Sequence, residues 1–205
     1  MRFNKLFFTL LCFSLFSCAP KDPNKQVDEG KVNGTIYESK EIGWSIEIPN
    51  DWQIISKDKI EQNEQLGKDA MEKTVGGPID TKTLKHLISF QKDRFNIFSS
   101  TSQPFKEEYA GEYKKNTQLI YDVLYNTFTD QGIKVDTASG KETVQGIEFN
   151  TFHTTIYKPD GKVILKQILY SQFLKGFDFG ATISYNNEEN KETMLKAWKN
   201  SKFTN

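Results

Sequence analysis

The last third of the chain constrains the fold most, because three strand-like segments follow one another there with only short connections between them. The segments are residues 147–157, 163–173 and 177–185. The first two flank Lys158-Pro159-Asp160-Gly161, which is typical of a turn because proline fixes φ and glycine tolerates positive φ. Strands joined by hairpins pair antiparallel. We therefore expect a β-meander whose faces must be covered by the remaining elements.

The side-chain pattern of these segments predicts how they are buried. Residues 163–173 are apolar on both faces, as expected of a central strand that is covered on both sides. Residues 177–185 have an apolar residue at every second position: Phe177, Phe179, Ala181, Ile183 and Tyr185. Asp178 should point away from that face, and we expect it to be solvated or paired with a lysine.

The middle of the chain predicts further strands and a helix. Trp44, Ile46 and Ile48 alternate with polar residues, which predicts a strand that ends at the turn 49–51 and is followed by an extended segment over 52–55. Residues 56–75 carry a ragged helical stripe that Gly76-Gly77-Pro78 ends. A pair of strands is expected next, over 84–90 and from residue 95 to 97.

Two more helices complete the prediction. The first can start at Pro104 and is closed by Gly132, with a stripe formed by Tyr109, Tyr113, Ile120, Leu124 and Phe128. The second has Asn186 as its N-cap with Glu189 three residues later, and an inward stripe formed by Met194, Leu195 and Trp198. The class is therefore α+β, with an antiparallel β-sheet covered by helices.

The N-terminus predicts export and a lipid anchor. Arg2 and Lys5 precede eleven residues, 6–16, of apolar and small character, which is typical of a secretory signal. Leu15-Phe16-Ser17-Cys18 resembles the bacterial lipobox, in which the peptide is cut before the cysteine and that cysteine is acylated. Two or three acyl chains make membrane attachment effectively permanent. Ala19 follows the anchor, and its likeness to lipoproteins with a non-acidic residue there favours the outer membrane, facing either the periplasm or the surface.

These features divide the chain into a signal peptide (1–17), a lipidated Cys18 with a flexible polar tether (18–40), and one globular domain (41–205). The whole chain carries 27 basic and 27 acidic residues, which argues against a nucleic-acid binder. Cys12 leaves with the signal and Cys18 becomes the anchor. The exported domain then has no disulfide or thiolate chemistry and depends on its hydrophobic core.

A short motif at the start of the domain resembles a known family. Gly43-Trp44-Ser45-Ile46-Glu47-Ile48-Pro49-Asn50-Asp51-Trp52 is similar to the opening strand of PsbP/Mog1-like domains, in which a strand ends in proline and a tryptophan follows the turn. The late meander and a final helix followed by a short aromatic segment, Trp198 to Phe203, match the family's layout. The resemblance covers residues 40–204 in outline and implies an αβα sandwich with a non-catalytic binding or assembly role.

The residues point to no catalytic centre, metal site or cofactor. His86 and His153, the only two histidines, lie on separate predicted strands and are expected to be ordinary strand residues. No Gly-x-Ser-x-Gly turn occurs, and no Gly-Lys-Ser/Thr follows Gly76-Gly77. We expect a protein that is not an enzyme.

Aromatic residues are the remaining binding candidates. Tyr121 and Tyr125 fall off the main helical stripe and either pack under a second cover or form an exposed patch that docks a partner. The first functional hypothesis is an anchored module that binds an envelope protein or supports an assembly. The alternative is a carrier of a small molecule or lipid in a cavity between sheet and helix, near Trp44 and Trp52.

Overall fold

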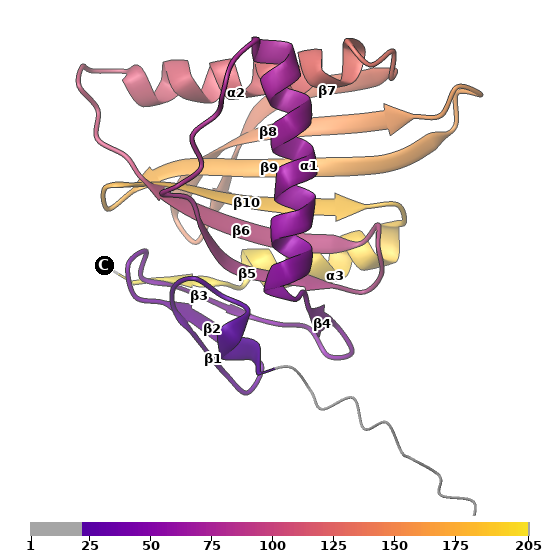
Figure 1. Ribbon diagram of the computed structural model, residues 1–205. Coiled ribbons are helices and arrows are strands. Elements are labelled where there is room, and N and C mark those ends of the chain that lie inside the picture. The colour runs from indigo at the N-terminus through magenta and orange to yellow at the C-terminus, as the bar shows by residue number, and fades with distance from the viewer. Residues whose placement is uncertain (1–21, 205) are drawn as a thin grey trace, which may run out of the picture.

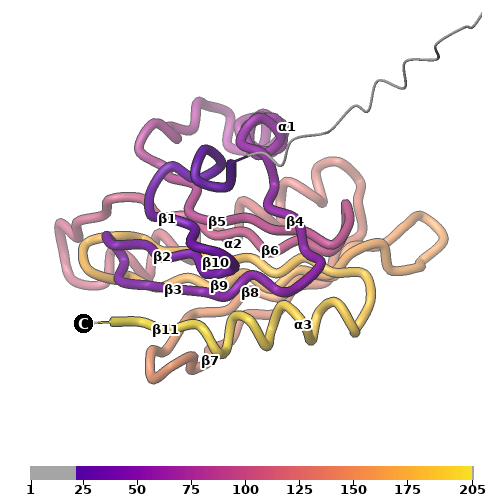
Figure 2. Tube along the Cα trace, turned by 90° about the horizontal axis from the view of Figure 1, so that it is seen from below, coloured from indigo at the N-terminus to yellow at the C-terminus, as the bar shows by residue number. Residues whose placement is uncertain are grey.

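The computed structural model describes residues 22–204, which form three layers. The middle layer is a seven-stranded sheet whose pairings are all antiparallel. Helices α1 (Lys57–Val75) and α2 (Glu112–Thr129) cover one face, with α1 crossing the strands and α2 lying near the β7 edge (Figure 1). Helix α3 (Glu188–Lys199) lies on the opposite face (Figure 2). This arrangement confirms the predicted α+β class with an antiparallel sheet between helices.

The two sheets are built from eleven strands. The large sheet has the order β4 (Gln53–Ile54), β5 (Lys85–Gln91), β6 (Ile97–Pro104), β10 (Phe177–Tyr185), β9 (Val163–Leu174), β8 (Ile147–Tyr157) and β7 (Val135–Val144). The small sheet has the order β1 (Lys31–Asn33), β2 (Ile36–Ser39), β3 (Trp44–Glu47) and β11 (Lys202–Phe203). A 3-10 turn, η1 (Pro23–Lys25), precedes them. No helix within residues 22–204 is long and apolar enough to span a bilayer.

The predicted meander is confirmed as β8, β9 and β10, while two boundaries and one additional strand differ from expectation. Strand β6 continues to Pro104, so α2 begins at Glu112 and not near the proline. The N-cap of α3 is Asn187, whose Oδ1 accepts the N–H of Asn190 at 2.9 Å, one residue later than predicted. Strand β7 was not expected, because most of this edge strand is exposed on both faces and shows no alternation.

The core lies between the large sheet, α3 and the small sheet. Trp198 of α3 is fully buried, with its ring centroid 5.2 Å from those of Phe149 and Tyr170 and 6.1 Å from that of Trp44. The ring of Trp44 packs edge-on against that of Phe179, with centroids 5.1 Å apart. Aromatic pairs of this kind contribute about 0.5–1.5 kcal/mol each beyond the burial of their surface. The cluster therefore ties the small sheet to the large one.

The predicted flexible tether is wrong from residue 22 onward. Tyr37 is fully buried and donates its hydroxyl proton to the Glu29 carbonyl at 2.7 Å. Gly30 has φ +82°, and a Cβ there would lie 2.4 Å from the Glu38 carbonyl oxygen, so the turn requires glycine. The folded unit therefore begins near residue 22 and not at 41, whereas residues 18–21 lie outside the described part. The segment folds despite its polar sequence because β2 pairs with β3 and few side chains are needed to fill this corner.

This correction predicts the effect of a deletion. A chain that begins at residue 41 loses β1, β2 and the buried Tyr37, and should lose at least about 3 kcal/mol of unfolding free energy relative to a chain that begins at residue 22. Urea denaturation followed by circular dichroism measures the difference. Equal midpoints for the two chains would restore the tether interpretation.

Candidate ligand-binding cavity

The face of the large sheet beneath α1 and α2 is mostly polar at its centre. In β10, Phe179, Ala181 and Ile183 point toward α3, so the residues between them point toward α1 and α2. Antiparallel register then places Thr101 of β6 and Ser171 of β9 on either side of Gly180. The residues of this face on the three central strands include Ser99, Thr101, Gln103, Gln167, Ser171, Asp178, Gly180, Thr182 and Ser184.

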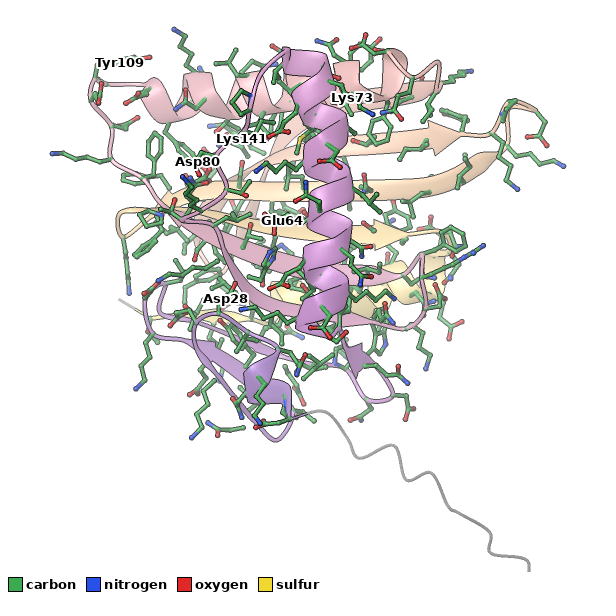
Figure 3. All side chains as sticks on the ribbon, in the orientation of Figure 1. Asp28, Glu64, Lys73, Asp80, Tyr109 and Lys141 are labelled. Atoms are coloured by element: carbon green, nitrogen blue, oxygen red, sulfur yellow. The ribbon has the colours of Figure 1, made fainter. Side chains whose placement is uncertain are left out.

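Helix α1 covers this face through polar contacts more than through apolar packing. Of its nineteen residues only Ile60 is buried. Glu64, labelled in Figure 3, lies 2.8 Å through Oε2 from Nε2 of His86 on β5. Lys59 donates to Oε1 of Gln91 at 3.1 Å. Helix α1 is therefore held to β5 mainly by polar contacts.

Helix α2 supplies the other wall, and its buried residues are Tyr113, Thr117, Tyr121 and Thr127. The Tyr121 ring stacks on Phe152 of β8, with centroids 4.4 Å apart and planes 8° apart. The Tyr121 hydroxyl lies 3.2 Å from Oγ of Ser171. The Tyr113 hydroxyl donates to Oδ1 of Asp178 at 2.9 Å. The side of α2 that faces the sheet is therefore amphipathic and carries hydroxyl groups.

Between α2, the loop before β5 and the large sheet lies a cavity of about 210 Å³, and α1 contributes none of its lining residues. Leu84, Ile120 and Leu169 form apolar parts of its wall, and Thr101, Ser171 and Asp178 bring polar atoms to it. For comparison, an engineered apolar cavity of about 150 Å³ holds benzene. Ligand sites combine an apolar wall with a few convergent polar groups. This cavity has that composition and is large enough for a small organic molecule.

Asp178 is the unusual group of the cavity. Burial raises the pKa of Asp178 above its ordinary value, and the hydrogen bond from Tyr113 opposes this increase. Burial beside this carboxyl also raises the pKa of Tyr113, so the phenol stays protonated and remains a donor. Among the ion pairs within residues 22–204, none involves Asp178. Of the two expectations for Asp178, the pairing with a lysine is wrong, and the carboxyl is half-buried, with Tyr113 as its partner.

The predicted aromatic binding residues do not form one surface. Trp44 is 1% exposed within the core, and Trp52 packs edge-on against Phe90 with centroids 5.8 Å apart. Tyr121 is 5% exposed and contributes to the cavity wall, while Tyr125 is 42% exposed. The exposed Tyr121/Tyr125 patch is thus reduced to Tyr125, and the cavity lies at Tyr121 and not at Trp44 and Trp52.

The two histidines lie apart. His86 faces α1 and pairs with Glu64, whereas His153 is exposed on β8, with Ile168 as its cross-strand partner. Over residues 22–204, no three His, Cys, Asp or Glu side chains are grouped so as to hold a metal ion. The sequence analysis missed the pair of Asp178 and Tyr113. The available signal was a carboxylate between two phenylalanines in a central strand.

The environment of Asp178 predicts that Asp178→Asn stabilises the protein. Because the folded-state pKa is raised, the ionised carboxylate costs stability above that pKa, and the cost disappears below the unfolded value near 3.8. Asparagine keeps an oxygen for Tyr113 and carries no charge. At pH 7 we expect Tm to rise by about 2–4 °C, the effect of about 1 kcal/mol in a protein of this size.

Thermal unfolding between pH 4 and pH 8 tests this expectation, and the gain should shrink as the pH falls toward 4. Asp122→Asn, on the exposed side of α2, is the matched control and should shift Tm by no more than about 1–2 °C at any of these pH values. A loss of stability at pH 7 for Asp178→Asn would contradict the account of this carboxyl.

Comparison with known proteins identifies the fold. No protein-family model matches the chain, and no curated protein matches it. It is similar to the solution structure of cyanobacterial PsbP (CyanoP) from Synechocystis sp. PCC 6803, with a TM-score of 0.55 and 10% identity. The match covers 85% of this chain and 98% of that chain. The chain therefore has a PsbP-like fold, as the resemblance at residues 43–52 predicted.

Proposed function

We propose that this chain is a non-catalytic, lipid-anchored module of the cell envelope that binds a small molecule in the cavity between the large sheet and helix α2. The PsbP-like fold is compatible with a non-catalytic accessory module. The lipobox-like sequence ending in Cys18 supports the anchor. The observation that carries the binding proposal is the carboxyl of Asp178 in the cavity wall.

A structural role explains Asp178 poorly. Within residues 22–204, the Asp178 side chain accepts one hydrogen bond, from the Tyr113 hydroxyl to Oδ1. No donor of this part of the chain reaches Oδ2. The carboxyl is half-buried, and the loss of part of its hydration raises its pKa and costs stability when it is ionised. Groups that reduce stability and face a cavity are typical of binding sites, where the missing partner comes from the ligand.

The early start of the fold brings the cavity-bearing domain close to the membrane. Residues 19–21 alone separate Cys18 from Asp22, the first residue that the structure describes. Four residue steps span at most about 14 Å. A lipidated Cys18 would therefore hold the domain against the bilayer surface, without the long spacer that the sequence predicted. We propose the outer membrane as this bilayer.

Docking of an envelope protein is the second candidate function. It is supported by Leu119 and Tyr125, which are 51% and 42% exposed on α2. Ile120, beside Leu119, is also exposed but lines the cavity, and exposed apolar residues in small numbers are common on protein surfaces. The cavity therefore supports ligand binding better than α2 supports docking.

The anchor is tested by substituting each cysteine of the full chain in its native cell. Cys18→Ala should abolish labelling by radioactive palmitate and move the protein out of the membrane fraction. Cys12→Ala is the matched control, since this cysteine lies within the signal and should leave labelling and fractionation unchanged. Equal labelling of wild type and Cys18→Ala would reject the anchor at Cys18.

The cavity is tested by filling it. A Cβ added at Gly180 would meet Oγ1 of Thr101 at 3.4 Å and the Tyr170 carbonyl at 3.7 Å, which are ordinary contacts, so Gly180→Val should place its methyl groups in the cavity without moving the backbone. Native mass spectrometry of protein purified from its own envelope should find a small-molecule adduct on the wild type that Gly180→Val has lost. An adduct retained by Gly180→Val, or none on the wild type, would contradict binding in this cavity.

A further inference from the structure

Resting on the proposed function, the geometry points to a ligand class: we infer that the cavity takes a small protonated amine, with its ammonium group on Asp178 and its apolar part against Leu84, Ile120 and Leu169. Four observations carry the inference: the charge of the cavity, its free acceptor atoms, its apolar wall and its volume.

Charge selects a cation. Asp178 is the only charged residue in the lining, which contains no lysine, arginine or histidine. A carboxylate in a partly buried site interacts strongly with an opposite charge, because little water screens it there. An anionic ligand would meet the same carboxylate without any compensating basic group. A cationic ligand would supply the positive charge that the cavity lining does not provide to Asp178.

Free acceptor atoms select a cation that carries N–H groups. Oδ1 of Asp178 accepts from Tyr113, while Oδ2 receives no hydrogen bond from the described chain. Thr101 and Ser171 flank Gly180 on the two neighbouring strands, two positions along β10 from Asp178. Diagonal neighbours of this kind lie about 7–8 Å apart, and both residues line the same cavity as Asp178, where their hydroxyl groups can accept hydrogen bonds. Oγ of Ser171 is already paired with the Tyr121 hydroxyl, so a primary ammonium would donate to Oδ2 and use a further N–H for a hydroxyl oxygen of the wall.

The apolar wall and the volume limit the rest of the molecule. The apolar part of the wall is formed by Leu84 in the loop before β5, Ile120 of α2 and Leu169 of β9. An apolar group of the ligand can pack against these three side chains. The 210 Å³ available exceeds the approximately 150 Å³ that holds benzene. A primary amine with one aromatic ring or a short aliphatic chain fits these limits, whereas a long acyl chain does not.

Three probes with one skeleton and different charges test the inference. They are 2-phenylethylamine, 2-phenylethanol and phenylacetate, each titrated into the purified protein at pH 7 and followed by ¹H–¹⁵N NMR. The amine should shift the amide signals of Thr101, Ser171 and Asp178 and bind at least about tenfold more tightly than the alcohol, as expected of a hydrogen bond to a charged group. Phenylacetate should cause no shift at these positions.

Two variants assign the binding. Asp178→Asn should weaken amine binding about tenfold and leave the alcohol unaffected, and its expected higher Tm guards against misfolding as the cause. Gly180→Val should remove binding of both molecules. Four results would each overturn the inference. They are equal affinities for amine and alcohol, binding of phenylacetate, an amine affinity that Asp178→Asn leaves unchanged, and no binding of the amine. The native mass comparison uses no amine, so it decides separately whether the cavity binds any ligand.

Discussion

The two faces of strand β10 set the character of the whole molecule. Phe179, Ala181 and Ile183 point to one side, where Trp198 and Trp44 pack against the sheet and join it to α3 and the small sheet. Side chains must alternate along a strand, so the intervening residues point to the other side. That side carries a carboxyl, a glycine and hydroxyl groups, and it cannot support a second hydrophobic core of the same kind. One face therefore stabilises the fold, and the other is available for binding.

The covering helices follow this division. Helix α3 buries Met194 and Trp198 completely, whereas α1 buries only Ile60 and is held to β5 by Glu64 and Lys59. The cavity lies where α2 covers the polar face of the sheet, with Thr117, Ile120 and Tyr121 in its wall. Asp178 in its wall lowers stability, a cost that a ligand can offset.

Much of the fold was predictable from the sequence, and the cavity was not. Alternation and turn residues identified β3, the meander from β8 to β10 and α3, since each of these elements has an apolar face against the core, and Gly76-Gly77-Pro78 marked the end of α1. Strands β1 and β7 lie at sheet edges, and β2, although it lies between β1 and β3, has only four residues, so none of the three shows a long apolar alternation. The stripe expected on α2 was misleading: Ile120 and Tyr109 are 45% and 51% exposed, while Thr117 is buried, because this helix faces polar residues. Asp178 gains its environment from Tyr113, 65 residues away, which no local pattern contains.

The most direct test of the account is the ¹³C NMR titration of the Asp178 carboxyl, without and with 2-phenylethylamine. Burial raises the pKa of Asp178, so the midpoint of the free protein should lie above 3.8. A bound ammonium group favours the ionised carboxylate, so the amine should lower that pKa. A titration midpoint of Asp178 at or below 3.8 in the free protein, or one that the amine leaves unchanged, would contradict the central claim. That claim is that Asp178 is a partly buried acid that binds a cation.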